Sequence, residues 1–161
     1  MSLEVAIGER AELGEGPRWD AATERLVWVD VEGKRLHVFD PETGDDRAIA
    51  LDQRVGVGQP MSDGRVLVAL ADRLAALDLE DESVETLVPM PHGPGLRLND
   101  GNCDPQGRFW VGSLELEFTP HVGSLYRYDG ELSEVLTGVT ISNGIGWSPD
   151  GTLMYLSLIH I

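Results

Sequence analysis

The chain has 161 residues, of which 28 are acidic and 12 are basic, so its formal net charge is −16. A field of that sign repels phosphate backbones and anionic membrane surfaces, so we expect neither nucleic acid nor a membrane as a partner. The single cysteine excludes an internal disulfide and a thiolate metal cluster. Nineteen glycines and nine prolines indicate frequent turns, and therefore many short strands rather than long helices.

No targeting signal is visible in the sequence. Residues 1–10 lack the basic start and the apolar stretch of a signal peptide. No apolar run approaches the length needed to span a membrane. We therefore expect a cytoplasmic protein with one domain, since no linker or low-complexity stretch divides the chain.

A turn followed by an apolar strand recurs along the chain. The copies are the turns 61–65, 104–108 and 148–152, followed by strands expected at 66–70, 109–111 and 153–156. The turn glycines Gly64, Gly107 and Gly151 are 43 and 44 residues apart, and a looser copy at 19–22 precedes a strand expected at 26–31. Repeats of this length predict propeller blades, because one four-stranded blade cannot bury both of its faces alone.

Further strands are expected between these turns. One covers 36–39 and ends at a turn over 41–44, and another covers 125–128 and ends at an Asp-Gly hairpin signal. One segment is ambiguous, because its leucines fall at helical spacing: Leu67, Leu70, Leu74 and Leu77. We predict strand–turn–strand there, because Gly64 opens the segment as in the other repeats and β-branched valines follow it.

Three short motifs carry polar side chains next to glycines. Glu15 lies between two glycines just ahead of an expected strand, where it could be presented to a ligand or be an acidic turn residue in water. Arg97 and Asn99 share a face if their segment is extended, and could hydrogen-bond a polyhydroxylated ligand. The alternative there is an Asn-Asp-Gly turn, and Asn143-Gly144 is by itself typical of a tight turn.

Other polar and aromatic residues give weaker signals. Glu115 and Glu117 are two apart and would share a face of one strand. No two of the histidines are close enough for a local metal motif: His37, His92, His121 and His160. The four tryptophans lie at or near expected strands, so we place them in the core: Trp19, Trp28, Trp110 and Trp147.

The ordered motifs together resemble a known family. LGEGPRW at 13–19, RLNDGNCDPQGRFWVGS at 97–113 and ISNGIGWSPDGTLMY at 141–155 each stand at an expected blade boundary. In this order they resemble the regucalcin/gluconolactonase family of sugar-lactone hydrolases. The resemblance covers most of the chain and implies an all-β fold of the six-bladed β-propeller type, truncated to roughly its first half, about three to four blades.

The resemblance also implies roles for individual residues. Glu15 matches the metal ligand of the first blade and Asn143 the amide-oxygen metal ligand. Arg97 and Asn99 match the pair that contacts the substrate. Glu117 aligns with a further acidic substrate contact, although Glu115 is a near neighbour. The family's remaining metal ligand, an aspartate also credited as the catalytic base, belongs to a later blade that is not in this chain.

The implied reaction is metal-assisted opening of a sugar lactone, with a small-molecule lactone as the partner. One divalent cation is expected, with calcium or zinc as the leading candidates and magnesium or manganese as alternatives. Two other functions stay open on the same residues. One is a non-catalytic calcium-binding propeller, and the other is a propeller esterase of the paraoxonase or strictosidine-synthase type.

The end of the chain reads LSLIHI, which resembles the translation of a transposon-end adapter used in sequencing libraries. We therefore expect a partial propeller over 1–155 followed by a non-native tail over 156–161. The alternative is a natural short strand that is apolar enough to pack. A partial propeller would expose open blade edges, so we expect poor stability, self-association and little activity for the chain as written.

Overall fold

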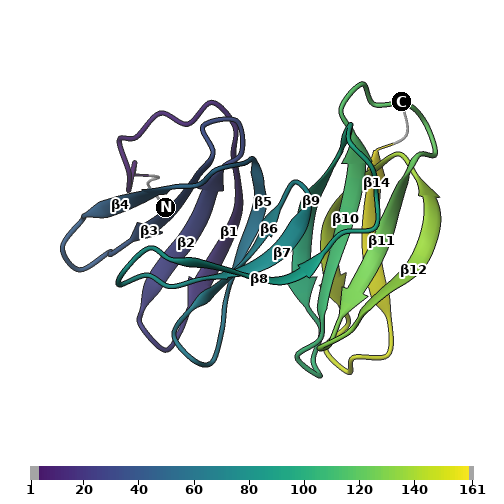
Figure 1. Ribbon diagram of the computed structural model, residues 1–161. Helices are drawn as coiled ribbons and strands as arrows, with labels where there is room; N and C mark the ends of the chain where they lie inside the picture. The colour runs from purple at the N-terminus through teal and green to yellow at the C-terminus, as the bar shows by residue number, and fades with distance from the viewer. Residues whose placement is uncertain (1–3, 160–161) are drawn as a thin grey trace.

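The computed structural model describes residues 4–159, and these form fourteen β-strands and no helix (Figure 1). The first unit consists of β1 (Gly14–Asp20), β2 (Arg25–Asp30), β3 (Arg35–Phe39) and β4 (Asp46–Ala50). The second consists of β5 (Val55–Pro60), β6 (Val66–Leu70), β7 (Arg73–Leu77) and β8 (Val84–Pro89). The third consists of β9 (Leu96–Cys103), β10 (Phe109–Glu115), β11 (Gly123–Tyr128) and β12 (Leu132–Val139). A fourth unit has β13 (Ile141–Trp147) and β14 (Met154–Ile159).

Each unit is an antiparallel sheet in which strands pair in chain order. The third and fourth units are joined by a single residue pair, Leu114 with Ile141. The first strands of successive units are neighbours, with β1 against β5, β5 against β9 and β9 against β13. This is the arrangement of propeller blades around an axis, so the fold predicted from the turn repeat is confirmed.

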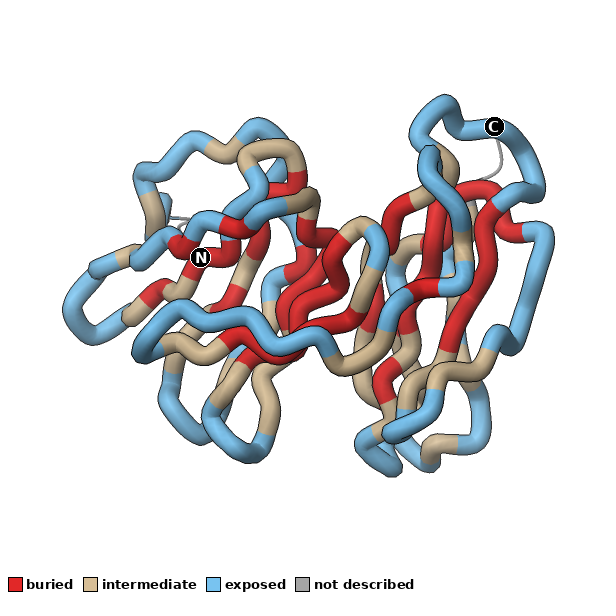
Figure 2. The backbone as a smooth tube through the Cα atoms, viewed as in Figure 1, coloured by how far each residue is buried: buried red, intermediate tan, exposed pale blue. Residues whose placement is uncertain are grey.

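The two middle strands of the second unit are buried on both faces. Along β6 and β7, Leu70 and Leu77 face a core shared with the first unit. Leu67 and Leu74 face a second core shared with the third unit. A strand that is apolar on both sides loses the polar–apolar alternation, which explains the ambiguous spacing of these leucines. Figure 2 shows the buried stretches along the strands and the exposed loops at both ends.

The repeated turns are closed by aspartate side chains. Asp63 accepts a hydrogen bond from the amide of Arg65 at 3.1 Å, and Asp150 accepts one from Thr152 at 3.1 Å. In the third unit the aspartate is two positions earlier, at Asp104. Asp104 is 5% exposed, and its carboxylate accepts four hydrogen bonds, two from backbone amides and two from the Arg108 and Trp110 side chains.

We expect Asp104→Asn to destabilise the fold by about 2 kcal/mol at pH 7, because an amide cannot accept all four bonds. Burial alone would raise the pKa of Asp104, but hydrogen bonds from Trp110 and Arg108 outweigh burial and lower that pKa. The carboxylate therefore stabilises the fold above pH 4, and this contribution is lost as the pH falls through the lowered pKa. Urea midpoints at pH 7 and pH 3 check this.

The matched control for that prediction is Asp63→Asn, which changes the exposed aspartate of the second unit's turn. Its effect at pH 7 should be much smaller than that of Asp104→Asn. The gap between the wild-type and Asp104→Asn midpoints should narrow at pH 3. An equal gap at both pH values would show that the carboxylate charge is not what Asp104 contributes.

The tryptophans and the end of the chain are the subject of two predictions from the sequence. The tryptophans do not form the core: Trp19 is 55% exposed, and Trp28, Trp110 and Trp147 are only partly buried. Their nitrogens need partners, and Trp28 and Trp110 donate to Asp46 and Asp104 at sheet margins. At the chain end, residues 156–159 lie in β14, whereas His160 and Ile161 are outside the described residues.

The adapter origin of 156–161 stays a prediction that the encoding codons would test. Within residues 4–159, the structure contains no helix of the length and apolarity required to cross a membrane.

Candidate functional site

The residues singled out in the sequence lie near the starts of the first strands. Glu15 is the second residue of β1, Arg97 the second of β9 and Asn143 the third of β13. Asn99 bonds to Ser142 and Asn102 to Ile145, so β9 and β13 run in the same direction. The starts of these first strands therefore meet at one end of the blades.

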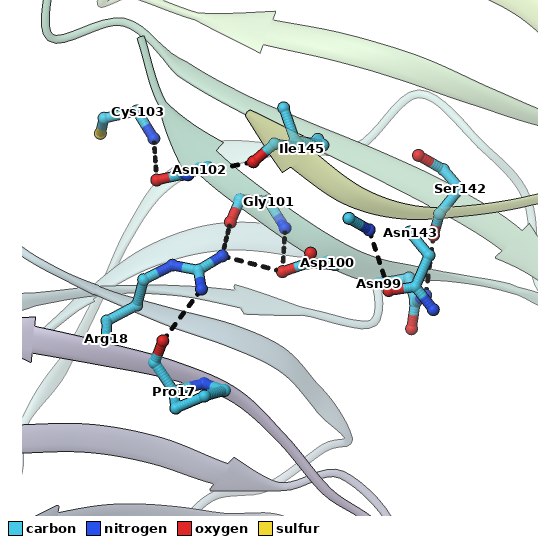
Figure 3. Close-up of polar contacts among 11 residues, drawn as sticks. Pro17, Arg18, Asn99, Asp100, Gly101, Asn102, Cys103, Ser142, Asn143 and Ile145 are labelled. Carbon is cyan, nitrogen blue, oxygen red and sulfur yellow. Dashed lines mark hydrogen bonds and ion pairs between the residues drawn. The ribbon is translucent and has the colours of Figure 1, made fainter. Parts of the chain in front are cut away.

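Arg97 and Asn99 share a face of β9, as predicted for an extended segment. Arg97 Nη1 donates to Asn99 Oδ1 at 2.8 Å and to the carbonyl of Leu98 at 3.0 Å. Asn99 Nδ2 donates in turn to the carbonyl oxygen of Ser142 on β13 at 2.8 Å (Figure 3). The alternative of an Asn-Asp-Gly turn is wrong, because all three residues lie inside a strand that pairs with β10.

Both metal-ligand candidates stand beside bulges in their strands. The register of β1 shifts between Glu15 and Arg18, where Gly16 has a φ of 57°. The register of β13 shifts between Asn143 and Ile145, where Gly144 has a φ of 21°. Gly16 and Gly144 therefore allow β-bulges inside strands, and do not form the turns that the sequence also allowed at these positions. A bulge re-aims neighbouring side chains, and such features are frequent beside functional sites.

Arg97 is a buried cation without an ion-pair partner among the described residues. It is 6% exposed, and its two hydrogen bonds go to neutral oxygens. Burial lowers the pKa of the Arg97 guanidinium. The negative charge of Glu32 acts in the opposite direction, the positive charge of Arg54 lowers the pKa further, and the negative charge of Glu15 raises it. Glu15 is therefore close enough to Arg97 to act on its charge, although no direct contact joins them.

A second arginine links the first and third units. Arg18 of β1 donates through Nη2 to Asp100 Oδ1 at 3.0 Å and to the carbonyl of Gly101 at 2.6 Å (Figure 3). Arg18 Nη1 also donates to the carbonyl of Pro17 at 3.0 Å. These contacts hold β9 one residue beyond Asn99, so Arg18 is a positioning residue for the site. Arg18 lies within the motif at 13–19, but no local pattern predicts its contact with β9.

The prediction that Glu115 and Glu117 share a strand face is wrong. Strand β10 ends at Glu115, and Glu117 follows in an exposed turn. Glu115 Oε2 instead accepts hydrogen bonds from the amides of Glu117 at 2.9 Å and Thr119 at 3.1 Å. Glu115 therefore closes the turn, and the substrate contact suggested for Glu117 stays a prediction.

The oxygen atoms that could bind a metal ion are of the predicted type, but only two of the predicted residues supply them. Glu15 offers a carboxylate, and Asn143 an amide oxygen whose one partner within residues 4–159 is the amide of Gly144, at 3.0 Å. Oxygen donors of this kind suit a hard divalent cation. In the described part of the chain, however, no three His, Cys, Asp or Glu side chains cluster as a metal site. These residues can supply part of a coordination shell.

Comparison with known proteins defines the family. Residues 13–157 match the model of the SMP-30/Gluconolactonase/LRE-like region. The chain belongs to this family. It is 35% identical over 159 residues to 6-deoxy-6-sulfogluconolactonase of Pseudomonas putida, which covers 97% of this chain and 55% of that protein. Regucalcin of Xenopus laevis is 31% identical over 163 residues, covering 96% of this chain and 54% of that protein.

The solved structures agree with this family membership. A calcium-binding regucalcin from Agrobacterium tumefaciens superposes with a TM-score of 0.91 and 28% identity, over 95% of this chain and 52% of that one. The chain thus spans about half the length of the curated relatives it matches. The family assignment from the three ordered motifs is confirmed, and so is the propeller fold.

Proposed function

We propose that the complete protein opens sugar lactones by hydrolysis, and that this chain supplies the substrate-positioning side of the site. The observation that supports this most is the hydrogen-bonded line from Arg97 through Asn99 to the Ser142 carbonyl. It brings a cation, an amide and the strand that carries Asn143 to one end of the blades. Lactonase relatives in the same family support the reaction class.

The chemistry assigned to each residue follows from its contacts. Arg97 and Asn99 hold each other in place, so they can present fixed donors to the oxygens of a sugar ring and restrict its orientation. Glu15 and Asn143 would hold a divalent cation. When bound, such a cation polarises a carbonyl and lowers the pKa of water. The aspartate base expected from the family is not among the residues of this chain that match its motifs.

Lactone opening by the complete protein is the test of this proposal. A pH-stat should record faster hydrolysis of gluconolactone than in buffer, and a chelator should remove the excess. Arg97→Met should lower kcat/KM by about 100-fold, because orientation of the substrate is lost. Arg10→Met is a matched control, since Arg10 is an exposed arginine outside the motif. Rates unchanged by the chelator would remove the metal role.

A second function is favoured by the calcium-binding regucalcin among the similar structures. In this alternative Glu15 and Asn143 bind calcium without turnover. Isothermal titration would then show calcium binding that Glu15→Gln weakens, while the complete protein opens gluconolactone no faster than buffer. Turnover that depends on Arg97 would rule this alternative out.

A further inference from the structure

A hollow of about 230 Å³ adjoins Arg97 at the end of the blades that carries the site. It is lined by the loops that follow β2, β4, β6 and β10 and by the start of β9. The lining side chains with a charge are Lys34, Asp52, Arg54 and Arg97. Arg54 is paired with Glu32, so the cations that line the hollow without an ion pair among the described residues are Lys34 and Arg97.

The acids near the hollow are already engaged. Both oxygens of Asp52 accept from Arg73 Nη2, at 2.9 and 2.8 Å. Arg54 Nε donates to Glu32 Oε2 at 2.8 Å. Lys34, the one lysine of the sequence, has no ion pair among the described residues. Its ammonium group is therefore available to an anion in the hollow.

Arg97 has hydrogen-bond donors that no protein group uses among the described residues. It is 6% exposed, and both of its hydrogen bonds come from Nη1. Its Nε and Nη2 have no partner among the described residues, although a guanidinium carries five donors in a fork that matches a planar or tetrahedral oxyanion. Arg97 lines the hollow, so an oxyanion bound there could accept hydrogen bonds from these two free nitrogens.

We propose that this hollow is an oxyanion subsite, and that the protein takes sugar lactones that carry an anionic group away from the lactone. The inference rests on the proposed function and deepens it. A sugar held by Asn99 and Arg97 would extend its distal end over the second unit toward Lys34 and Arg54. A carboxylate, sulfonate or phosphate there would meet the donors of Arg97 and the charge of Lys34.

The test compares two hydroxy acids that differ only in a terminal phosphate. Isothermal titration of the whole chain with 6-phosphogluconate and with gluconate, in calcium-containing buffer, should show at least a tenfold tighter binding of the phosphorylated acid. Raising the ionic strength should shrink this preference, because partly exposed charges are screened. Equal affinities, or no binding of 6-phosphogluconate, would overturn the proposal.

Variants locate the preference. Lys34→Met and Arg54→Gln should each lower the affinity for 6-phosphogluconate at least threefold and lower that for gluconate less. Arg35→Gln is the matched control, because it removes the neighbouring positive charge, which does not line the hollow. A preference that survives Lys34→Met in a variant whose circular dichroism melt matches wild type would contradict the subsite.

Two further measurements separate the possible failures. Inorganic phosphate should bind more weakly than 6-phosphogluconate, and equal binding would show an anion site unrelated to a sugar. If the complete protein opens gluconolactone but shows no preference for a phosphorylated lactone, only the subsite fails. If it opens neither lactone while the chain prefers 6-phosphogluconate, the proposed reaction fails and the anion site stands.

Discussion

Replacing Gly56 by alanine should destabilise the fold by about 3 kcal/mol, because the added methyl group has no space between the second and third units. A Cβ there would lie 2.8 Å from both Asn99 Cα and Leu98 O, and closer still to Asn99 O. These are backbone atoms of β9, so no side chain can rotate away. The strand that carries Asn99 would have to move.

The consequence should reach the site as well as the stability. Asn99 joins Arg97 to the Ser142 carbonyl, so a displaced β9 backbone breaks this line of hydrogen bonds. We expect thermal unfolding by circular dichroism to shift down by about 6–12 °C. Binding of 6-phosphogluconate should weaken in the same variant at a temperature where it is still folded.

Gly146→Ala is the control for Gly56→Ala. Neither glycine has a positive φ, so alanine fits both backbones, but a Cβ on Gly146 meets nothing within 4 Å. Alanine there should leave stability unchanged or raise it by about 0.5 kcal/mol, because it restricts the unfolded chain. If the Gly56→Ala and Gly146→Ala variants unfold at the same temperature, the close approach of β5 and β9 is not rigid.

The sequence carries most of the fold because its signals are local. The turns at Gly64, Gly107 and Gly151 each precede a strand as predicted, and the Asp-Gly signal at 129–130 joins β11 to β12. The environments of several side chains were predicted wrongly. The tryptophans look apolar in a sequence, but the ring nitrogens of Trp28 and Trp110 require partners, which are aspartates at the sheet margins rather than in the core.

The site was only partly predictable for a related reason. Arg97 and Asn99 are two residues apart, so a strand is enough to place them on one face. The contact between Asn99 and Ser142 spans 43 residues, and the one between Arg18 and Asp100 spans 82. Lys34 reaches the hollow from a loop within the first unit, and Arg54 from the connection between the first and second units. Such contacts depend on how the units stack, which no local pattern encodes.

The contact between the third and fourth units offers the sharpest test of that stacking. A Cβ on Gly112 would collide with the Oγ and Cβ atoms of Ser142, while the Ser142 Cα would stay 3.4 Å away. Ser142 is fully buried, and its Oγ has no hydrogen-bond partner among the described residues. The unpaired hydroxyl of Ser142 therefore lowers the stability of the fold. Its side chain fits there because Gly112 has no Cβ.

We therefore expect Gly112→Ala to destabilise the fold by about 3 kcal/mol, and Ser142→Gly by about 1 kcal/mol. The double variant Gly112→Ala/Ser142→Gly should recover most of the first loss, because the colliding atoms are gone. The coupling in this cycle should reach about 3 kcal/mol, measured by urea unfolding. Ser142→Ala should be neutral or stabilising, because it removes an unpaired hydroxyl. Additive losses in the double variant would show that β13 does not pack on β10 through these two residues, and the support that β13 gives to Asn99 would then need another origin.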